Sequence, residues 1–208
     1  MKKIKEGIFI TFEGIDGCGK STQSKLLCDY LIRNGYGVVY TREPGGTKLA
    51  ESLRNMLLNP RNMISPLAEL FLYESSRSEH VRSIILPALK AKKIVVCDRF
   101  SDATIAYQGY GRGLDLKMIG DLNRFSSAGL TPDLTILLDI PAAEGLKRAK
   151  HLKQNDRMEK ENLSFYESVR RGYLALAEKF PKRIKLVKTS GTIEETHSII
   201  LGIVKRKI

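Results

Sequence analysis

The sequence contains few cysteines, and their arrangement excludes a disulfide framework. Only three, Cys18, Cys28 and Cys97, occur among its 208 residues. No two of them form a C-x-x-C pair, and an odd number leaves at least one thiol unpaired. We therefore expect free thiols and a reducing, cytoplasmic location, because disulfides rarely persist there.

Long hydrophobic runs are also missing from the sequence. No stretch approaches the roughly 20 apolar residues that a membrane-spanning helix needs. The first residues are basic, but the apolar run that follows them, Ile8 to Phe12, is too short for a signal peptide and leads into a glycine-rich segment. We expect a soluble protein without a membrane partner.

Acidic residues are too few to balance the basic ones. The chain has 35 Lys and Arg against 23 Asp and Glu, which gives a formal net charge of +12. This excess predicts anionic ligands. The basic residues are spread along the chain and form no single stripe interleaved with aromatic residues, so phosphorylated small molecules are better candidates than nucleic acid.

Internal repeats and low-complexity linkers are absent, and short apolar runs alternate with longer helical patterns. Runs rich in β-branched residues predict buried parallel strands at 8–12, 38–41, 94–98, 134–140 and, more weakly, 184–187. We predict one α/β domain over residues 1–208, with three layers in which helices flank a parallel sheet of about five strands.

Two helices carry clear start signals. Ser65 and Pro66 suit the N-cap and first position of a long helix that should bend or end near Pro87. Thr192 and Glu195 have the spacing of a capping box for the last helix.

A glycine-rich segment directly follows the first predicted strand. It matches the P-loop pattern G-x-x-x-x-G-K-[ST] and precedes a predicted helix, which is the context that such a match requires. Glycines allow the backbone to turn its N–H groups towards phosphate at the positive end of the helix. The residues expected at the phosphates of ATP are Gly14, Ile15, Asp16, Gly17, Cys18, Gly19, Lys20, Ser21 and Thr22.

The P-loop predicts that the three-layer domain has the P-loop NTPase fold, but it does not define the reaction. A switch GTPase should also carry a guanine-reading N-K-x-D motif, but no asparagine of this chain is followed by lysine. An ATPase motor would offer no second small-molecule pocket, whereas this chain has residues for one.

Asp98 and Arg99 mark that second site. They follow the buried run that ends at Asp98, and ligands collect at the carboxyl ends of strands in such sheets. Asp98 is expected beside Mg²⁺ together with Ser21, and Arg99 is expected on a phosphate, since guanidinium binds two oxygens at once. The alternative is a buried Asp–Arg pair with a purely structural role.

Residues 147–161 are almost wholly charged or polar. They suit either a solvated helix surface or a mobile lid, at about 148–160, that brings cations over bound phosphates.

Five motifs then resemble those of one family. Bacterial thymidylate kinases have similar segments in the same order, and here they read FEGIDGCGKST (12–22), TREPGGT (41–47), DRFSDATIAYQGYGRGLD (98–115), PDLTILLDIP (132–141) and DRMEKE (156–161). The resemblance implies a nucleoside monophosphate kinase of nucleotide biosynthesis that phosphorylates dTMP to dTDP, with ATP as donor and Mg²⁺ as cofactor, and that forms a homodimer through apolar stretches such as 69–73 or 83–89. The alternatives are a kinase of another pyrimidine nucleoside monophosphate, a non-catalytic nucleotide-binding regulator, and a nucleic-acid-associated ATPase.

The resemblance also implies roles for individual residues. Catalytic roles would fall to Lys20, Arg99, Asp16, Arg148 and Arg157. The dTMP site would comprise Asp16, Glu43, Tyr73, Arg77, Arg99, Thr104, Tyr107 and Gln108. Tyr73 would stack on the base, although a helix-core role is the alternative for it, and the ring of Tyr107 would disfavour a 2′-hydroxyl.

The lid departs from the family pattern. Gly17 stands where the eukaryotic branch has a catalytic arginine, and the lid here offers lysines at 150 and 153 beside Arg148 and Arg157. Lysine cannot clamp two oxygens as arginine does, so several cations are candidates for the transferring group. No histidine base is needed, because the acceptor phosphate has a second pKa near 6. The three histidines, at 80, 151 and 197, can then be surface residues.

Overall fold

The structure, a computed structural model, describes residues 2, 4–151 and 156–208. Five parallel strands form one sheet in the order β2-β3-β1-β4-β5. The strands are β1 (Ile8–Glu13), β2 (Val38–Arg42), β3 (Ile94–Asp98), β4 (Leu134–Asp139) and β5 (Ile184–Lys188). The predicted five-stranded parallel sheet is confirmed, including its weakest strand.

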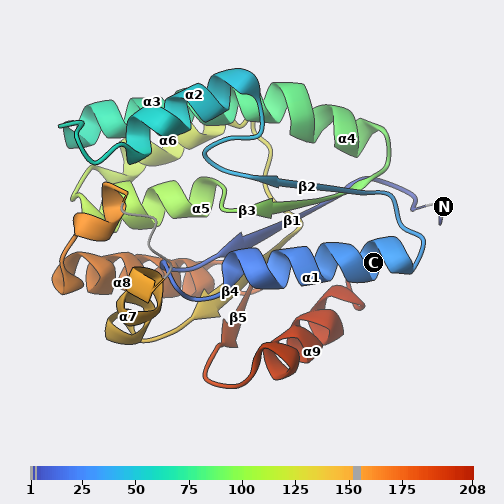
Figure 1. Ribbon diagram of the computed structural model, residues 1–208. Coiled ribbons are helices and arrows are strands. Elements are labelled where there is room, and N and C mark those ends of the chain that lie inside the picture. Colours follow the sequence, from blue (N-terminus) through green and yellow to red (C-terminus); the bar gives the residue numbers. More distant parts are fainter. Residues whose placement is uncertain (1, 3, 152–155) are drawn as a thin grey trace.

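Helices cover both faces of the sheet, which gives three layers (Figure 1). One side carries α2 (Lys48–Leu58), α3 (Pro66–His80), α4 (Leu86–Lys90) and α6 (Leu116–Ser126), and the other carries α1 (Lys20–Arg33), α8 (Leu163–Lys179) and α9 (Ile193–Val204). The remaining helical segments are η1 (Val81–Ile85), α5 (Ser101–Thr104), η2 (Ile105–Gly111), α7 (Ala142–His151) and η3 (Met158–Lys160).

The central strand β1 shows why the sheet segments are apolar throughout. Phe9 packs edge-on against Phe100, with ring centroids 4.9 Å apart, in the cluster that includes Ile85. Ile10 and Phe12 instead belong to the larger cluster with residues of α1, α8 and α9. Successive side chains of a strand point to opposite faces, so a strand covered on both faces must be apolar at every position.

The predicted long helix is present, but it does not end at Pro87. Ser65 is the N-cap and Pro66 the first residue of α3, and the helical run continues to Lys90. A π-helical turn, η1, lies just before the proline, and Leu86 donates its N–H to the carbonyl of Val81, five residues back. A wider turn suits this place, since proline has no N–H and its ring crowds the preceding turn.

The capping box of the last helix is confirmed. The side chain of Thr192 accepts from the N–H of Glu195, and the carboxylate of Glu195 accepts from the N–H of Thr192. This box fixes where α9 begins after β5.

The register of the strands brings three functional segments to one edge of the sheet. Phe12 of β1 and Arg42 of β2 both pair with Asp98 of β3. The P-loop, Glu43 and Arg99 therefore leave the sheet side by side. Within the described residues, no helix is long and apolar enough to span a bilayer.

Candidate active site

The P-loop connects β1 to α1 in a conformation that requires glycine. Gly14, Gly17 and Gly19 have φ angles of 137°, 75° and 95°, in the region that favours glycine. A Cβ atom at Gly14 would collide with the carbonyl of Leu138, and one at Gly17 with the carbonyl of Gly145. The loop is thus packed tightly against neighbouring backbone and leads into the N-terminus of α1, which is suited to bind an anion.

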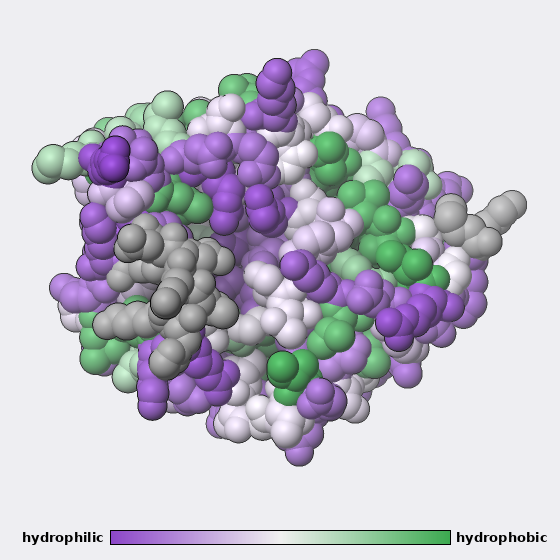
Figure 2. Space-filling model, viewed as in Figure 1, coloured by the Kyte–Doolittle hydropathy of each residue, from purple (hydrophilic) through white to green (hydrophobic). Residues whose placement is uncertain are grey.

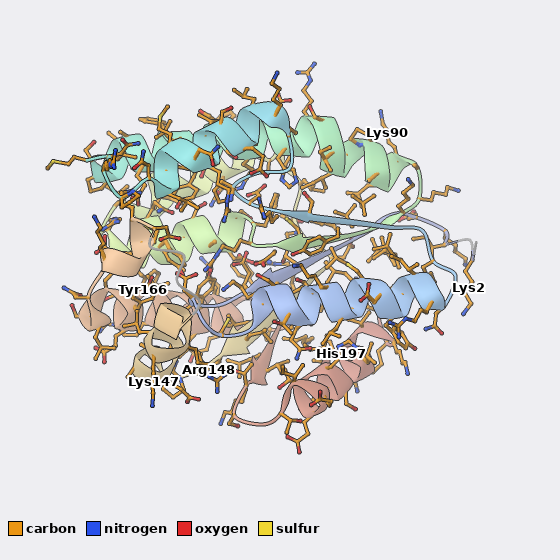
Figure 3. All side chains as sticks on the ribbon, in the orientation of Figure 1. Lys2, Lys90, Lys147, Arg148, Tyr166 and His197 are labelled. Carbon is orange, nitrogen blue, oxygen red and sulfur yellow. The ribbon has the colours of Figure 1, made fainter. Side chains whose placement is uncertain are left out.

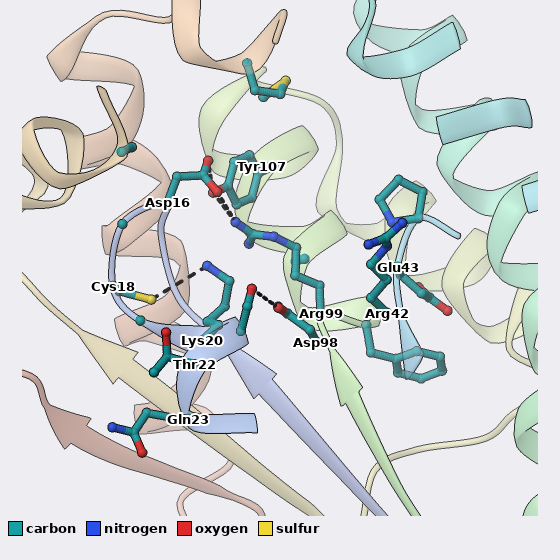
Figure 4. A pocket seen from close by; sticks show the side chains of 18 of the residues that line it. Asp16, Cys18, Lys20, Thr22, Gln23, Arg42, Glu43, Asp98, Arg99 and Tyr107 are labelled. Atoms are coloured by element: carbon teal, nitrogen blue, oxygen red, sulfur yellow. Dashed lines mark hydrogen bonds and ion pairs between the residues drawn. The ribbon is translucent and has the colours of Figure 1, made fainter. Parts of the chain in front are cut away.

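Lys20 and Ser21 at the start of α1 are both held in place. Lys20 is buried, and its Nζ donates to the carbonyl of Ile15 at 2.8 Å and to Sγ of Cys18 at 3.6 Å. The hydroxyl of Ser21 donates to Oδ2 of Asp98 at 2.5 Å (Figure 4). The hydroxyl and carboxylate that the sequence assigns to Mg²⁺ are therefore adjacent.

Arg99 lies between the P-loop and η2. Its guanidinium donates to the carbonyl of Gly14 at 2.9 Å, to Oδ1 of Asp16 at 2.5 Å and to the hydroxyl of Tyr107 at 3.0 Å. Its backbone has a φ of 70°, in the left-handed region that non-glycine residues rarely adopt. Such conformations persist only where surrounding contacts impose them, and they cluster at active sites.

Asp16 is the carboxylate partner of Arg99. The hydroxyls of Tyr107 and Tyr166 both donate to its Oδ2 at 3.1 Å. Burial opposes its ionisation, but the cations of Arg99 and Lys20, followed by these two phenols, lower the pKa of Asp16 to about 2. Asp16 is consequently an anion throughout the neutral range.

Arg77 of α3 organises the other half of the site. Its Nε donates to Glu43 at 2.8 Å, its Nη1 to Glu74 at 3.0 Å and to Asn123 at 2.6 Å, and its Nη2 to the hydroxyl of Thr104 at 2.8 Å. Burial opposes the charge, but the two carboxylates raise the pKa of Arg77 further above its ordinary value. The guanidinium is thus a fixed donor at this wall.

Thr104, Tyr107 and Gln108 come from α5 and η2. Gln108 donates from Nε2 to Glu69 at 2.9 Å and is buried. The π-helical η2 begins directly after Thr104, and such turns are frequent at functional sites. Tyr73 of α3 faces the same space, and burial followed by the charge of Glu69 raises the pKa of its phenol.

A single cavity of about 710 Å³ joins the two halves. The P-loop, Asp98, Arg99, Glu43, Tyr73, Arg77, Thr104, Tyr107 and Gln108 all contribute to its wall, and it extends along Gln23 to the loop before α9. Its cationic lining residues are Lys20, Lys25, Arg42, Arg54, Arg77, Arg99 and Arg148. Figure 2 shows a hollow among hydrophilic residues near the centre of the viewed face.

The two arginines of the predicted lid, Arg148 and Arg157, lie in different places. Arg148 of α7 contributes to the cavity wall and forms an exposed ion pair with Glu144, and Figure 3 shows it on the side of α7 nearer α1. Arg157 instead donates to the carbonyl of Leu57 at 2.9 Å and pairs with Glu69, which fastens its segment to α2 and α3. Lys153 and the side chain of Lys150 lie outside the described residues.

His80 corrects one expectation. It is fully buried rather than on the surface, with Nε2 2.6 Å from the hydroxyl of Thr41 and Nδ1 3.0 Å from Oε1 of Glu43. One signal could have revealed it, since His80 follows Arg77 by three positions and so shares its helix face.

Sequence reasoning also missed Arg54, Tyr166 and Tyr173. Arg54 contributes to the cavity wall and donates to the carbonyl of Pro44 at 3.0 Å. Tyr166 and Tyr173 are seven positions apart on α8, about two helical turns, and their hydroxyls reach Asp16 and Arg99. This aromatic spacing was the available signal for both tyrosines.

Known proteins resemble this chain over most of its length. A family model described as thymidylate kinase matches residues 12–200. The chain is 46% identical over 194 residues to the thymidylate kinase of Kosmotoga olearia, covering 93% of each chain. It is 50% identical over 198 residues to that of Geotalea daltonii, covering 91% of this chain and 92% of the relative. The chain belongs to the thymidylate kinase family.

A solved structure supports the same assignment. The crystal structure of thymidylate kinase from Ehrlichia chaffeensis matches with a TM-score of 0.80 and 38% identity, covering 96% of this chain and 99% of that one. The predicted fold class, family and enzyme class are confirmed, and the chain is a nucleoside monophosphate kinase that phosphorylates dTMP with ATP as donor. The alternatives of another pyrimidine acceptor and of a non-catalytic regulator are not favoured.

Proposed function

We propose that this chain catalyses Mg²⁺-dependent phosphoryl transfer from ATP to dTMP within the cavity between the P-loop and α3. The observation that carries the proposal is the position of Arg99. Its guanidinium contacts Gly14 and Asp16 of the P-loop and Tyr107 of the opposite wall. A cation between donor and acceptor phosphates can stabilise the charge that moves between them.

The residues present suit Mg²⁺. Ser21 and Asp98 offer a hydroxyl and a carboxylate oxygen in contact with each other, and Mg²⁺ prefers oxygen ligands. Among the described residues, no group of three or more His, Cys, Asp or Glu could enclose a metal. This agrees with an ion bound through few protein groups, waters and phosphates. When bound, Mg²⁺ would neutralise charge on the donor phosphates.

The protein's own contribution is positioning and charge. The acceptor phosphate is substantially ionised at neutral pH, so no strong general base is required. We assign Lys20 and the P-loop amides to the donor phosphates, and Arg99 to the transferring group. Asp16 holds Arg99 in place and approaches the acceptor sugar.

We assign binding of the acceptor's base and sugar to the cavity wall around Arg77. We propose that Tyr73 stacks on the pyrimidine, that Arg77, Thr104 and Gln108 bind polar atoms of the base and its surroundings, and that Glu43 faces the sugar. All five contribute to the cavity wall, and their mutual hydrogen bonds reduce the freedom that binding must remove.

The lid proposal rests on Arg148. Its side chain is at the cavity and exposed, so it can move onto phosphate without breaking buried contacts. We expect Arg148→Ala to lower kcat by about 100- to 1,000-fold, a typical cost of removing one transition-state contact. Arg157→Ala should mainly raise KM for dTMP, because Arg157 braces Glu69, which accepts from Gln108.

Single substitutions at 148, 150, 153 and 157 test the lid, with kcat and both KM values measured for each. A kcat that none of the four changes would remove the lid from the mechanism.

The decisive assay is formation of ADP with Mg-ATP and each common nucleoside monophosphate in turn, with the diphosphate product identified. We expect strong turnover with dTMP and little with the purine, cytidine or ribouridine monophosphates. Equal turnover with all of them would mean that the base wall around Arg77 is misassigned. Matched assays with EDTA test the requirement for the metal.

We also propose a homodimer formed through α2 and α3. Phe71 on α3 is 49% exposed, and Met56, Met63 and Leu67 are further exposed apolar residues of these helices and their connection. The stretch 83–89 is a poorer candidate, since none of its residues is among the exposed large hydrophobic residues of the described chain. Light scattering should give twice the mass of 23.4 kDa, and Phe71→Lys should lower it. A monomeric wild-type protein would contradict this proposal.

The three cysteines are free and buried, which supports a reducing compartment such as the cytoplasm.

A further inference from the structure

Glu13 is a buried carboxyl group that the P-loop pattern does not include. It is the last residue of β1 and has no exposed surface. Its Oε1 accepts from the backbone N–H of Phe100 at 2.7 Å, and its Oε2 accepts from the hydroxyl of Tyr173 at 2.8 Å. A carboxyl group in such a place requires partners for both oxygens, and it has them.

Both hydrogen-bond partners of Glu13 are linked to Arg99, one by a peptide bond and the other by a hydrogen bond. Phe100 is the next residue along the chain, so its amide follows the left-handed backbone of Arg99 directly. The hydroxyl of Tyr173 accepts from Nη1 of Arg99 at 3.1 Å. Glu13 thus fixes Arg99 at its two ends, through the backbone after it and through a phenol at its guanidinium.

We infer that Glu13 is a positioning residue for phosphoryl transfer. Its carboxyl group holds the Phe100 amide and the Tyr173 hydroxyl, and these two contacts orient Arg99 between the P-loop and the acceptor wall, which is the part of the cavity wall formed by residues from Glu43 to Gln108. The inference rests on the proposed function of Arg99. It adds a residue that touches neither nucleotide and acts through the cation that does.

The charged groups around Glu13 define the appropriate substitution. Its charged neighbours are Arg99 and Asp102. Asp102 also forms an ion pair with Arg183, the residue directly before β5. Burial and then Asp102 raise the pKa of Glu13 to about 8. Oε1 can accept from the N–H of Phe100 whether or not Glu13 is ionised. The hydrogen between Oε2 and the Tyr173 hydroxyl comes from the tyrosine when Glu13 is ionised, and it can come from the carboxyl group when Glu13 is protonated. Glutamine can make both contacts, whereas methionine fills a similar volume and makes neither.

The test compares Glu13→Met with Glu13→Gln in the full chain, using dTMP and Mg-ATP. We expect Glu13→Met to lower kcat by about 10- to 100-fold, because a displacement of about 1 Å at a catalytic group can cost that much. KM for ATP should change less than about twofold, since the P-loop itself is unaltered. Glu13→Gln should restore most of kcat.

A double-mutant cycle separates positioning from general stabilisation. In an Arg99→Ala background, Glu13→Met should lower kcat little further, because its effect passes through Arg99. The inference would be overturned if the two substitutions lowered kcat by independent factors that multiply in the double variant. It would also be overturned if Glu13→Met alone left kcat unchanged.

Tyr173→Phe keeps the test decisive if Glu13→Met does not fold. It removes one contact of Glu13 and should show the same dependence on Arg99, whereas the matched control Tyr110→Phe, at a 37% exposed residue, should not. The wild-type rate with dTMP is measured first. Its absence would reject the proposed function, whereas a normal rate with an additive cycle would reject only the role of Glu13.

Discussion

At the scale of single residues, Tyr107 is fixed by two charged groups. Its hydroxyl donates to Asp16 and accepts from Arg99, and the residue is almost fully buried. A ring held so firmly cannot move aside for an additional hydroxyl on a substrate. We therefore connect Tyr107 with the choice between deoxyribose and ribose.

Tyr107→Ala should weaken discrimination against ribose. We expect the ratio of kcat/KM for dTMP to that for its ribose analogue to fall by about 10-fold, which corresponds to about 1.4 kcal/mol. Tyr107→Phe retains the ring and serves as the control for the steric part. An unchanged ratio in the alanine variant would exclude this role.

Glu13 should leave a signature in the pH dependence of stability. Burial and the neighbouring Asp102 raise its pKa from the ordinary 4.5 to about 8 in the folded protein. Folding therefore takes up a proton between these pH values, so this residue's contribution to the free energy of unfolding is largest below 4.5 and declines as the pH rises towards 8. Glutamine does not titrate and lacks this decline.

Urea denaturation across that range measures the effect. Glu13→Gln should gain stability relative to wild type as the pH is raised. A constant difference between the two proteins would show that the carboxyl group ionises normally.

Residue types and spacing identify Lys20, Ser21, Asp98 and Arg99 in the sequence because their motifs are contiguous. The partners that orient them are not contiguous. Tyr173 meets Glu13 across 160 positions of the chain, and His80 meets Glu43 across 37. Only the packing of α3 and α8 against the sheet brings these pairs together, so spacing could not predict them.

At the scale of elements, α7 packs closely against the P-loop. A Cβ atom at Gly145 would lie 2.8 Å from the carbonyl of Asp16 and from Cδ1 of Ile15. Glycine at this position allows the helix that carries Arg148 to approach the loop backbone. The placement of Arg148, the proposed lid cation, therefore depends on a residue with no side chain.

Gly145→Ala should separate these two elements. Alanine favours a helix interior by about 1 kcal/mol over glycine, but here we expect the close contact to outweigh that gain and to lower both kcat and the melting temperature. Gly202→Ala on α9 is the matched control, because nothing lies within 4 Å of a Cβ there, and it should stabilise the protein. If both variants were stabilised with normal kcat, the packing argument would be wrong.

The elements themselves were largely predictable, and the exceptions have physical causes. Strand patterns, Ser65 and the capping box at Thr192 are local signals, and each places its element correctly. The π-helical turns are different, because η1 and η2 depend on how long helical runs adapt to a proline or to the wall of a cavity. No short stretch of sequence records such an adaptation.

At the scale of the whole molecule, basic residues outnumber acidic ones, both along the chain and in the cavity that we assign to the substrates. The net charge is +12, and among the described residues the cavity wall includes seven basic and four acidic side chains. Both substrates are anions, so the field of the protein should favour their approach.

We expect KM for dTMP to rise several-fold between low ionic strength and about 0.5 M salt, with a smaller change in kcat. Salt screens interactions between exposed charges that lie more than a Debye length apart, and this length is about 10 Å at 0.1 M and shorter at higher salt. Steady-state kinetics at several salt concentrations measure this. A KM that is independent of ionic strength would show that contacts inside the cavity dominate binding.

The strand order has a consequence for how such enzymes can diversify. β2 and β3 lie on one side of β1, and the acceptor-wall residues from Glu43 to Gln108 form one uninterrupted part of the chain. The P-loop precedes that part, and the loop before α9 follows it. Recombination at two points, one after α1 and one before β4, would therefore exchange the proposed acceptor wall as one piece and keep the P-loop, provided that the incoming segment also ends its third strand with the Asp98–Arg99 pair.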